Sequence, residues 1–104
     1  MNPYLIKLYD RVKETSYSMG TGPVELNGAS AGFSAFGDRY ANEEAVFYAI
    51  TDGTHFEVGS GIFTTGPDKI TRFPFRSSDN DSVIDFGTGL KEVYVTYPAD
   101  YTVT

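Results

Sequence analysis

The fold is decided by the stretch Ala45-Val46-Phe47-Tyr48-Ala49-Ile50-Thr51-Asp52-Gly53-Thr54-His55-Phe56-Glu57-Val58. Its first six residues are all apolar or aromatic, which is typical of a strand covered on both faces. Asp52-Gly53 then supplies a dipeptide that favours a tight turn between two strands. In the returning segment Phe56 and Val58 face one way, whereas His55 and Glu57 face the other. The stretch therefore predicts an antiparallel hairpin at the centre of the fold.

Strand and turn signals continue at short intervals on both sides of this hairpin. Further strands are expected over residues 24–26, 33–36, 61–64, 69–76, 82–86 and 92–97. Pro74 cannot donate to a ladder, so the strand that contains it should lie at an edge or carry a bulge. A competing helix over 42–47, capped by Asn42, should amount to one turn at most. About seven short antiparallel strands predict an all-β fold, either a single-domain β-sandwich or a small barrel.

Length and composition agree with one small domain. The chain has 104 residues, which is room for a single core, and it has no cysteine for disulfides or thiolate metal sites. Eleven glycines suit many tight turns, and eight phenylalanines and eight tyrosines suit strands and interfaces. Association with other chains is the obvious further source of stability.

The charge argues against two classes of partner. The formal net charge is −6, and the eight lysines and arginines are scattered along the chain. Nucleic acid and anionic membrane surfaces attract clustered cations, so neither is expected as a partner. No apolar run approaches the roughly twenty residues that span a bilayer. The first ten residues also lack the pattern of a secretory signal, so we expect synthesis in the cytosol.

The two ends of the chain carry the best interface candidates. Residues 1–9 are expected to form an N-terminal docking arm ahead of a β-sandwich domain over 10–104. Asn2 and Pro3 could instead begin a short helix, and we favour the arm. The candidate docking residues are Tyr4, Leu5, Ile6, Leu8, Tyr9, Tyr97 and Tyr101. If the ends lie together, these side chains would form an aromatic patch suited to a protein interface; otherwise they only cover the core.

No catalytic, cofactor or metal site is expected. His55 with Glu57 could act as a general base, but a histidine beside a hairpin turn is more simply a surface residue. Asp79, Asn80, Asp81 and Asp85 offer oxygens for calcium, yet their spacing is not that of a calcium loop, and such residues also form ordinary turns. The Gly-X-Gly triplets at 20–22, 59–61 and 87–89 are interpreted as turns and bulges, since no Lys-Ser/Thr pair follows them.

The order of motifs resembles that of a known structural module. Residues 10–15 open the domain, 47–59 form the hairpin, 70–72 follow it, and 93–99 close it. This arrangement is similar to a module widespread in virion proteins of tailed phages, found near the start of tail-fibre-like proteins and as small standalone proteins. Residues 73–76 depart from its usual Thr- and Val-rich strand. The chain also ends soon after Pro98, which argues against a complete host-recognition fibre.

The resemblance implies a non-enzymatic virion component made in the bacterial host cytoplasm. Such a protein would be a tail or fibre-base accessory protein, or a capsid decoration protein. It would dock on other virion structural proteins and would form a homo-oligomer, as a trimer or ring. An alternative is a small carbohydrate-binding module whose tyrosines stack on host surface polysaccharide. A small hydrolase ranks last, because no nucleophile and base can be paired.

Overall fold

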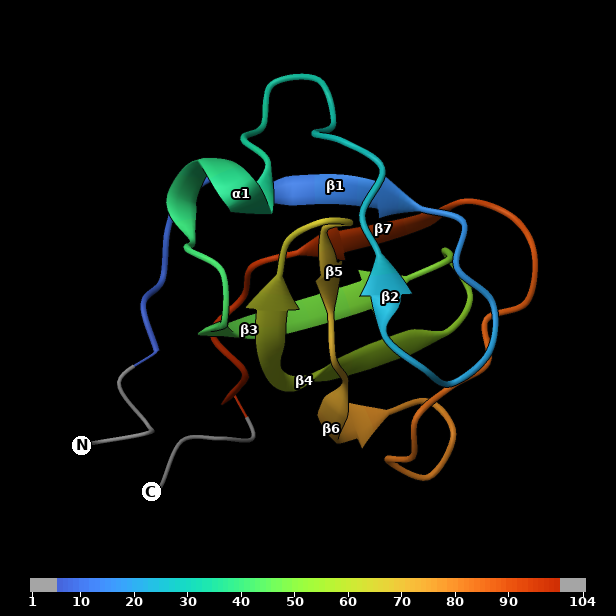
Figure 1. The fold of residues 1–104 in the computed structure, drawn as a ribbon. Coiled ribbons are helices and arrows are strands. Elements are labelled where there is room, and N and C mark those ends of the chain that lie inside the picture. Colours follow the sequence, from blue (N-terminus) through green and yellow to red (C-terminus); the bar gives the residue numbers. More distant parts are fainter. Residues whose placement is uncertain (1–5, 100–104) are drawn as a thin grey trace.

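A computed structural model describes residues 6–99 and confirms the all-β class (Figure 1). The described chain forms β1 (Lys13–Ser16), β2 (Val24–Glu25), α1 (Phe36–Arg39), β3 (Glu44–Thr51), β4 (Phe56–Thr64), β5 (Lys69–Ile70), β6 (Phe73–Ser77) and β7 (Lys91–Tyr94). All strand pairs are antiparallel, in the order β1-β7-β3-β4-β5-β2, and β6 pairs with β4. The single sheet curls into a half-barrel, with β2 and β5 in front of β3 and β4 and with α1 next to β1 in Figure 1.

The central hairpin forms as predicted. β3 and β4 pair from Glu44 opposite Phe63 to Thr51 opposite Phe56. In the turn, the Asp52 Oδ1 atom accepts the backbone N–H groups of Thr54 at 2.9 Å and His55 at 2.7 Å. These hydrogen bonds, the one from His55 first, lower the pKa of Asp52 to about 2. A side chain that mimics a backbone turn in this way fixes the reversal locally.

β4 joins two predicted strands into one. Gly59 and Gly61, which the sequence places in turns or bulges, both lie inside β4, and the bulge is confirmed at Gly59. They are needed there because a Cβ atom would collide with the carbonyl oxygen of Phe73 at Gly59 and with that of Thr71 at Gly61. The missing side chains let residues 71–74 cross β4 closely. A bulge in the β4–β6 pairing falls between Val58 and Gly59.

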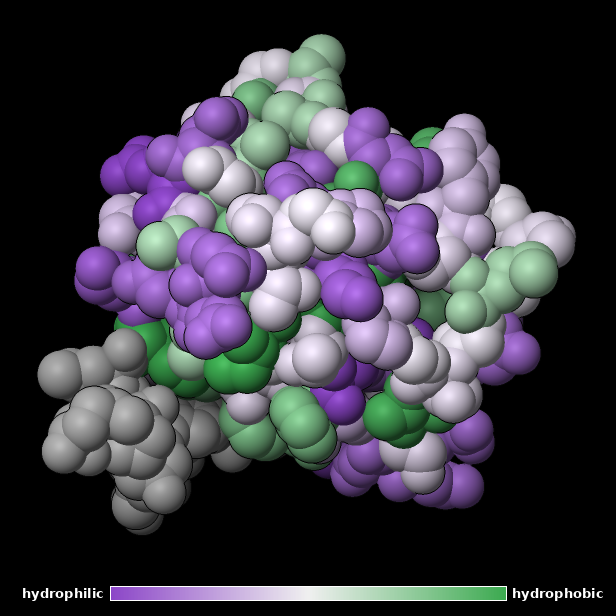
Figure 2. Space-filling model, in the orientation of Figure 1, coloured by the Kyte–Doolittle hydropathy of each residue, from purple (hydrophilic) through white to green (hydrophobic). Residues whose placement is uncertain are grey.

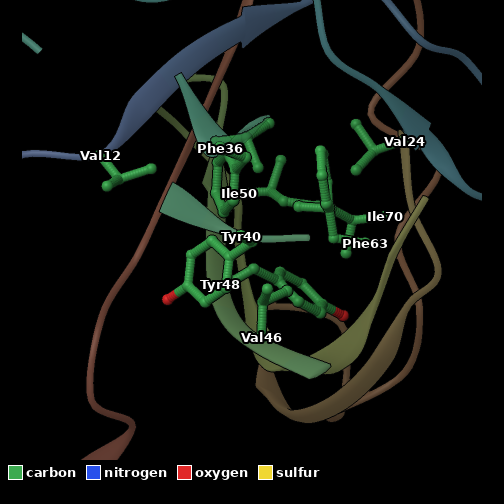
Figure 3. Close-up of a cluster of buried hydrophobic side chains, with 10 residues drawn as sticks. Val12, Val24, Phe36, Tyr40, Val46, Tyr48, Ile50, Phe63 and Ile70 are labelled. Atoms are coloured by element: carbon green, nitrogen blue, oxygen red, sulfur yellow. The ribbon is translucent and has the colours of Figure 1, made fainter. Parts of the chain in front are cut away.

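The core lies on the concave face of the sheet (Figure 3). Its side chains come from β2, β3, β4, β5, β7, the residue before β1 and the region around α1: Val12, Val24, Phe36, Tyr40, Val46, Tyr48, Ile50, Phe63, Ile70 and Val93. The Phe36 ring stacks near those of Tyr40 and Phe63, with centroids 6.0 and 6.3 Å away. The two tyrosine hydroxyls point out of the cluster on opposite sides, where each finds a hydrogen-bond acceptor.

A buried carboxylate ties α1 and the loop after β2 to the sheet. Glu14 on β1 is almost fully buried, and its two oxygens accept the N–H groups of Gly28 at 2.9 Å and Phe36 at 2.7 Å. A bridge between Glu14 and Ala29 extends the sheet beyond β1. Burial raises the pKa of Glu14, and the two hydrogen bonds oppose that shift. The edge of β1 is therefore covered by residues 27–34.

Three of the expected strands are wrong or divided. The strand expected at 33–36 is a loop that enters α1 at Phe36, so the one helical turn precedes the segment 42–47 considered for it. The strand expected at 82–86 is a loop, because side chains and not a neighbouring strand bind its backbone. The strand expected at 69–76 is divided at Thr71 and Arg72 into β5 and β6. β6 does lie at an edge, as Pro74 predicted.

The side of the molecule that carries α1, β2 and β5 is largely polar. Figure 2 shows hydrophilic and weakly polar residues over most of this side, with hydrophobic residues in separate small patches. None of the helical structure within 6–99 is long and apolar enough to cross a bilayer.

Candidate functional site

A buried ion pair lies beside the hydrophobic core, on the inner face of β4. The Glu57 side chain is 0% exposed and the Arg72 side chain is 3% exposed. Glu57 Oε1 accepts from Arg72 Nη2 at 2.7 Å and from the Ile84 N–H at 2.9 Å. Its Oε2 atom accepts from the Tyr48 hydroxyl at 2.6 Å and from Arg72 Nε at 3.1 Å. Four donors thus satisfy this carboxylate.

The guanidinium of Arg72 is also saturated. Besides its two bonds to Glu57, its Nη1 atom donates to the carbonyl oxygens of Gly20 and Gly22, both at 3.1 Å. Its Nη2 atom donates to the carbonyl oxygen of Ile84 at 2.5 Å. All five donors of a guanidinium are therefore used. We call Glu57, Arg72 and Tyr48 the charge clamp, which holds the loops at 20–22 and 82–86 against β4.

The chemistry of the charge clamp is structural. Burial, followed by the hydrogen bond to Glu57, raises the pKa of Tyr48, so this hydroxyl keeps its proton. A general acid or base needs a free position facing a substrate, and Glu57 has no free position. A buried pair whose partners satisfy each other orders the chain around it.

His55 is a surface residue, as expected, and the alternative pairing of His55 with Glu57 does not occur. His55 lies exposed in the hairpin turn, and its Nδ1 atom is 3.2 Å from Asp52 Oδ2. Glu57 points instead to the inner face of the sheet. Phe56 and Val58 share the outer face, as the alternation predicted.

The acidic residues considered for calcium have separate local roles. Asp81 Oδ1 accepts the Ser77 N–H at 3.1 Å and lies 3.8 Å from Arg76 Nε. Asp85 Oδ1 accepts the N–H groups of Gly20 and Gly87, both at 2.9 Å. Within 6–99, no three His, Asp or Glu side chains gather as metal ligands would. The glycine loop at 87–89 holds Lys91, whose Nζ atom donates to two of its carbonyl oxygens.

The outer face of the sheet carries aromatic rings around a hollow. This hollow, the outer groove, has a volume of about 420 Å³ and is lined chiefly by Ala49, Phe56, Val58, Phe75, Tyr94 and Tyr97. The buried Phe47 ring packs edge-on against two of the lining rings, those of Phe75 and Tyr97, with centroids 6.3 and 6.1 Å away. Phe56 is 41% exposed, Tyr97 53%, and the neighbouring Phe73 63%. Strands β3, β4, β6 and β7 all contribute to this face.

The predicted docking residues fall in two places. Tyr97 lies at the outer groove. Tyr9 packs edge-on against Tyr40 at 5.0 Å, and the backbone of Lys7 accepts the Tyr40 hydroxyl at 2.7 Å, so this part of the arm lies on its own domain. Leu8 is exposed and Ile6 is partly buried. Tyr4, Leu5 and Tyr101 lie outside the described residues, so the arm as a docking element stays a prediction.

Sequence reasoning missed Phe56, Phe73 and Phe75 as surface residues. A partial signal was present in β4, where Gly59 and Gly61 occupy alternate positions on the same face as Glu57. Two glycines at alternate positions offer no side chain to a core, so they indicate a close backbone approach on their face. This signal does not show which face the rest of the chain covers.

Comparisons with known proteins give no family. No family model, no curated protein and no solved structure matches the chain. The function must therefore be argued from the geometry of the two faces of the sheet.

Proposed function

We propose that this protein is a non-enzymatic structural domain that docks on another protein subunit through the outer face of its sheet. The observation that carries the proposal is the outer groove, which is lined by the exposed rings of Phe56 and Tyr97, with the exposed Phe73 in the same strand as the lining residue Phe75. Apolar side chains gathered on one surface mark interaction sites more often than isolated ones do. Aromatic rings around a hollow also match the anchors that dominate binding energy at interfaces.

The inner face supports the same proposal. Its charged groups are buried and bonded to each other, which rigidifies the sheet beneath the outer groove. A rigid face loses little conformational entropy when it binds, so more of the contact energy appears as affinity. Such a design suits a component of an assembly.

We place this docking domain in the virion of a tailed phage. The setting rests on the resemblance of the motif order at 10–15, 47–59, 70–72 and 93–99 to phage virion modules. The partners would be other virion structural proteins at the tail, fibre base or capsid surface, and the chain would form a trimer or ring. Residues 1–9 would add to docking as an arm.

The test compares two double variants of the full chain, produced with an affinity tag in the cells that naturally make it. Phe56→Ser with Tyr97→Ser removes two rings from the outer groove. Tyr17→Ser with Met19→Ser is the matched control, because these side chains are at least as exposed and line neither the outer groove nor its rim.

Sedimentation through a density gradient is the measurement. The parent and the control should sediment with particle-sized assemblies, whereas the outer-groove variant should remain in the slow fractions. If the outer-groove variant sediments like the parent, or if the parent itself never enters large assemblies, the docking function is wrong. Phage structural proteins in the parent's fraction would establish the virion setting.

Carbohydrate binding is the second candidate. Tyr94 and Tyr97 offer rings beside the polar side chains of Thr96 and Arg76, a combination that suits stacking and hydrogen bonding to a sugar. Calorimetric titration of the full chain with host surface polysaccharide measures it. A heat of polysaccharide binding that is measured for the parent and is absent for the Tyr97→Ser variant would favour this function over protein docking.

A further inference from the structure

A second hollow adjoins the outer groove. This hollow, the basic notch, has a volume of about 350 Å³ and is lined by Arg11, Lys13, Phe33, Glu92 and Tyr94, among others. Tyr94 lines both hollows, so the two lie next to each other on either side of this β7 side chain. A partner segment seated in the outer groove could extend past Tyr94 into the basic notch.

Two cations gather over one ring in the basic notch. The guanidinium carbon of Arg11 lies 4.0 Å from the centroid of the Phe33 ring, and Lys13 Nζ lies 4.3 Å from it. Contact with a ring holds each cation in place but does not neutralise its charge. The chain has only eight lysines and arginines and a net charge of −6, so two cations in one hollow are a local exception.

The cations of the basic notch have few partners within the domain. Lys13 Nζ is 3.6 Å from Glu92 Oε2, and Glu92 is exposed. Arg11 donates from Nη2 to the Gly32 carbonyl oxygen at 3.3 Å, and within 6–99 it forms no ion pair with a carboxylate. A guanidinium has five donors, so Arg11 keeps donors for a partner.

We infer that the segment docking on the outer face is an acidic peptide segment of another protein, whose apolar side chains fill the outer groove and whose carboxylates bind Arg11 and Lys13 in the basic notch. This inference rests on the docking function proposed above. The two cations of the basic notch favour this occupant, because an acidic segment offers counter-charges to both Arg11 and Lys13. An apolar groove next to two cations fits a peptide that carries both apolar and acidic side chains.

The probes are two fluorescein-labelled octapeptides, one alternating phenylalanine with glutamate and one alternating phenylalanine with glutamine. The full chain should bind the glutamate peptide on the order of tenfold more tightly, and added salt should reduce that preference. Fluorescence anisotropy measures both dissociation constants.

The variant that tests the basic notch is Arg11→Asn with Lys13→Gln. Asparagine is chosen because Arg11 has a φ of 58°, which asparagine tolerates better than most residues. The preference for the glutamate peptide should disappear in this variant, and binding of the glutamine peptide should not change. Arg39→Gln is the matched control, because Arg39 lies 4.2 Å over the ring of Tyr9 and lines neither hollow. It should keep the preference.

Each failure has a different signature. If the basic-notch variant still prefers the glutamate peptide, or if the parent binds neither peptide, the inference is overturned while the sedimentation result for the docking function stands by itself. If analytical ultracentrifugation shows that the chain alone forms dimers that Phe56→Ser with Tyr97→Ser abolishes, the occupant is a second copy, which also overturns it. Loss of both peptides in the outer-groove variant, with the preference intact in the control, supports it.

Discussion

Each face of the sheet carries side chains that are unusual for their surroundings. On the inner face the charge clamp buries Glu57 and Arg72 with their polar atoms satisfied. On the outer face, from the same strand β4, Phe56 and Ile62 are exposed. A buried charge is stable only where an opposite charge and hydrogen bonds compensate it. An exposed ring needs no such compensation, and it contributes to binding where a partner covers it. The inner face therefore determines stability, and the outer face is available for binding.

The largest effect on stability should follow from breaking the charge clamp. Glu57→Gln leaves the Arg72 cation buried without its counter-charge, so the free energy of unfolding should fall by about 3–5 kcal/mol. Glu92→Gln is the control, because Glu92 is exposed and its pair with Lys13 should contribute less than about 1 kcal/mol. Urea unfolding followed by circular dichroism measures both. Equal losses in the two variants would contradict the contrast between the faces.

A smaller loss should follow from a side chain added on the inner face of β4. In Gly61→Ala the new methyl group collides with the carbonyl oxygen of Thr71, so residues 71–74 must move away from β4. We expect a loss of roughly 1–3 kcal/mol in thermal or urea unfolding. Gly22→Ala, with open space around its Cβ position, should stay within about 1 kcal/mol of the parent. An unchanged free energy of unfolding in Gly61→Ala would show that residues 71–74 need not pack so closely against β4.

Glu14→Gln tests the second buried carboxylate on the inner face. The amide keeps one acceptor for two N–H donors, so the loss at pH 7 should be about 1–3 kcal/mol. The folded-state pKa of Glu14 is raised above about 4.5, so its stabilising contribution is present below that value and is lost as pH rises through the raised pKa.

The pH dependence of this variant has a definite sign. Because the parent gains stability as pH falls from 7 towards 5 and the variant lacks this titration, the loss caused by Glu14→Gln should be larger at pH 5 than at pH 7. Urea unfolding at both pH values measures it, with the exposed Glu25→Gln as the control. A loss that shrinks towards pH 5 would mean that Glu14 is better stabilised as a carboxylate than its burial suggests.

The smallest effect should come from the outer face. Phe73→Ser removes the most exposed ring near the outer groove, and its stability should stay within about 0.5 kcal/mol of the parent. The melting temperature, measured by differential scanning fluorimetry, gives the comparison. A loss of stability as large as that of Gly61→Ala would mean that Phe73 packs as a core residue. That result would contradict the interpretation of the outer face as a binding surface.

Local signals predicted the hairpin and the edge position of β6. They failed where the backbone of a segment is hydrogen-bonded to side chains and not to a neighbouring strand. Asp52 and Gly53 determine the turn within a few residues, and Pro74 lacks the N–H that a central strand needs. The loop at 82–86 has strand-like residues, yet Glu57 and Arg72 bind the backbone of Ile84 from a distance in sequence. Of the candidate docking residues, Tyr97 lies at the outer groove, and the rings around it were not predicted.

The sequence by itself determined that β4 has two alternating faces, because side chains in a strand point to opposite sides with a period of two. Only the tertiary structure decided which face is buried. Arg72 and the backbone at 20–22 and 82–84 gather around Glu57 and compensate its charge, and the close approach of residues 71–74 requires glycine on that side. These partners are distant in the sequence, so a local pattern could not identify the inner face or show that the aromatic rings would be left outside.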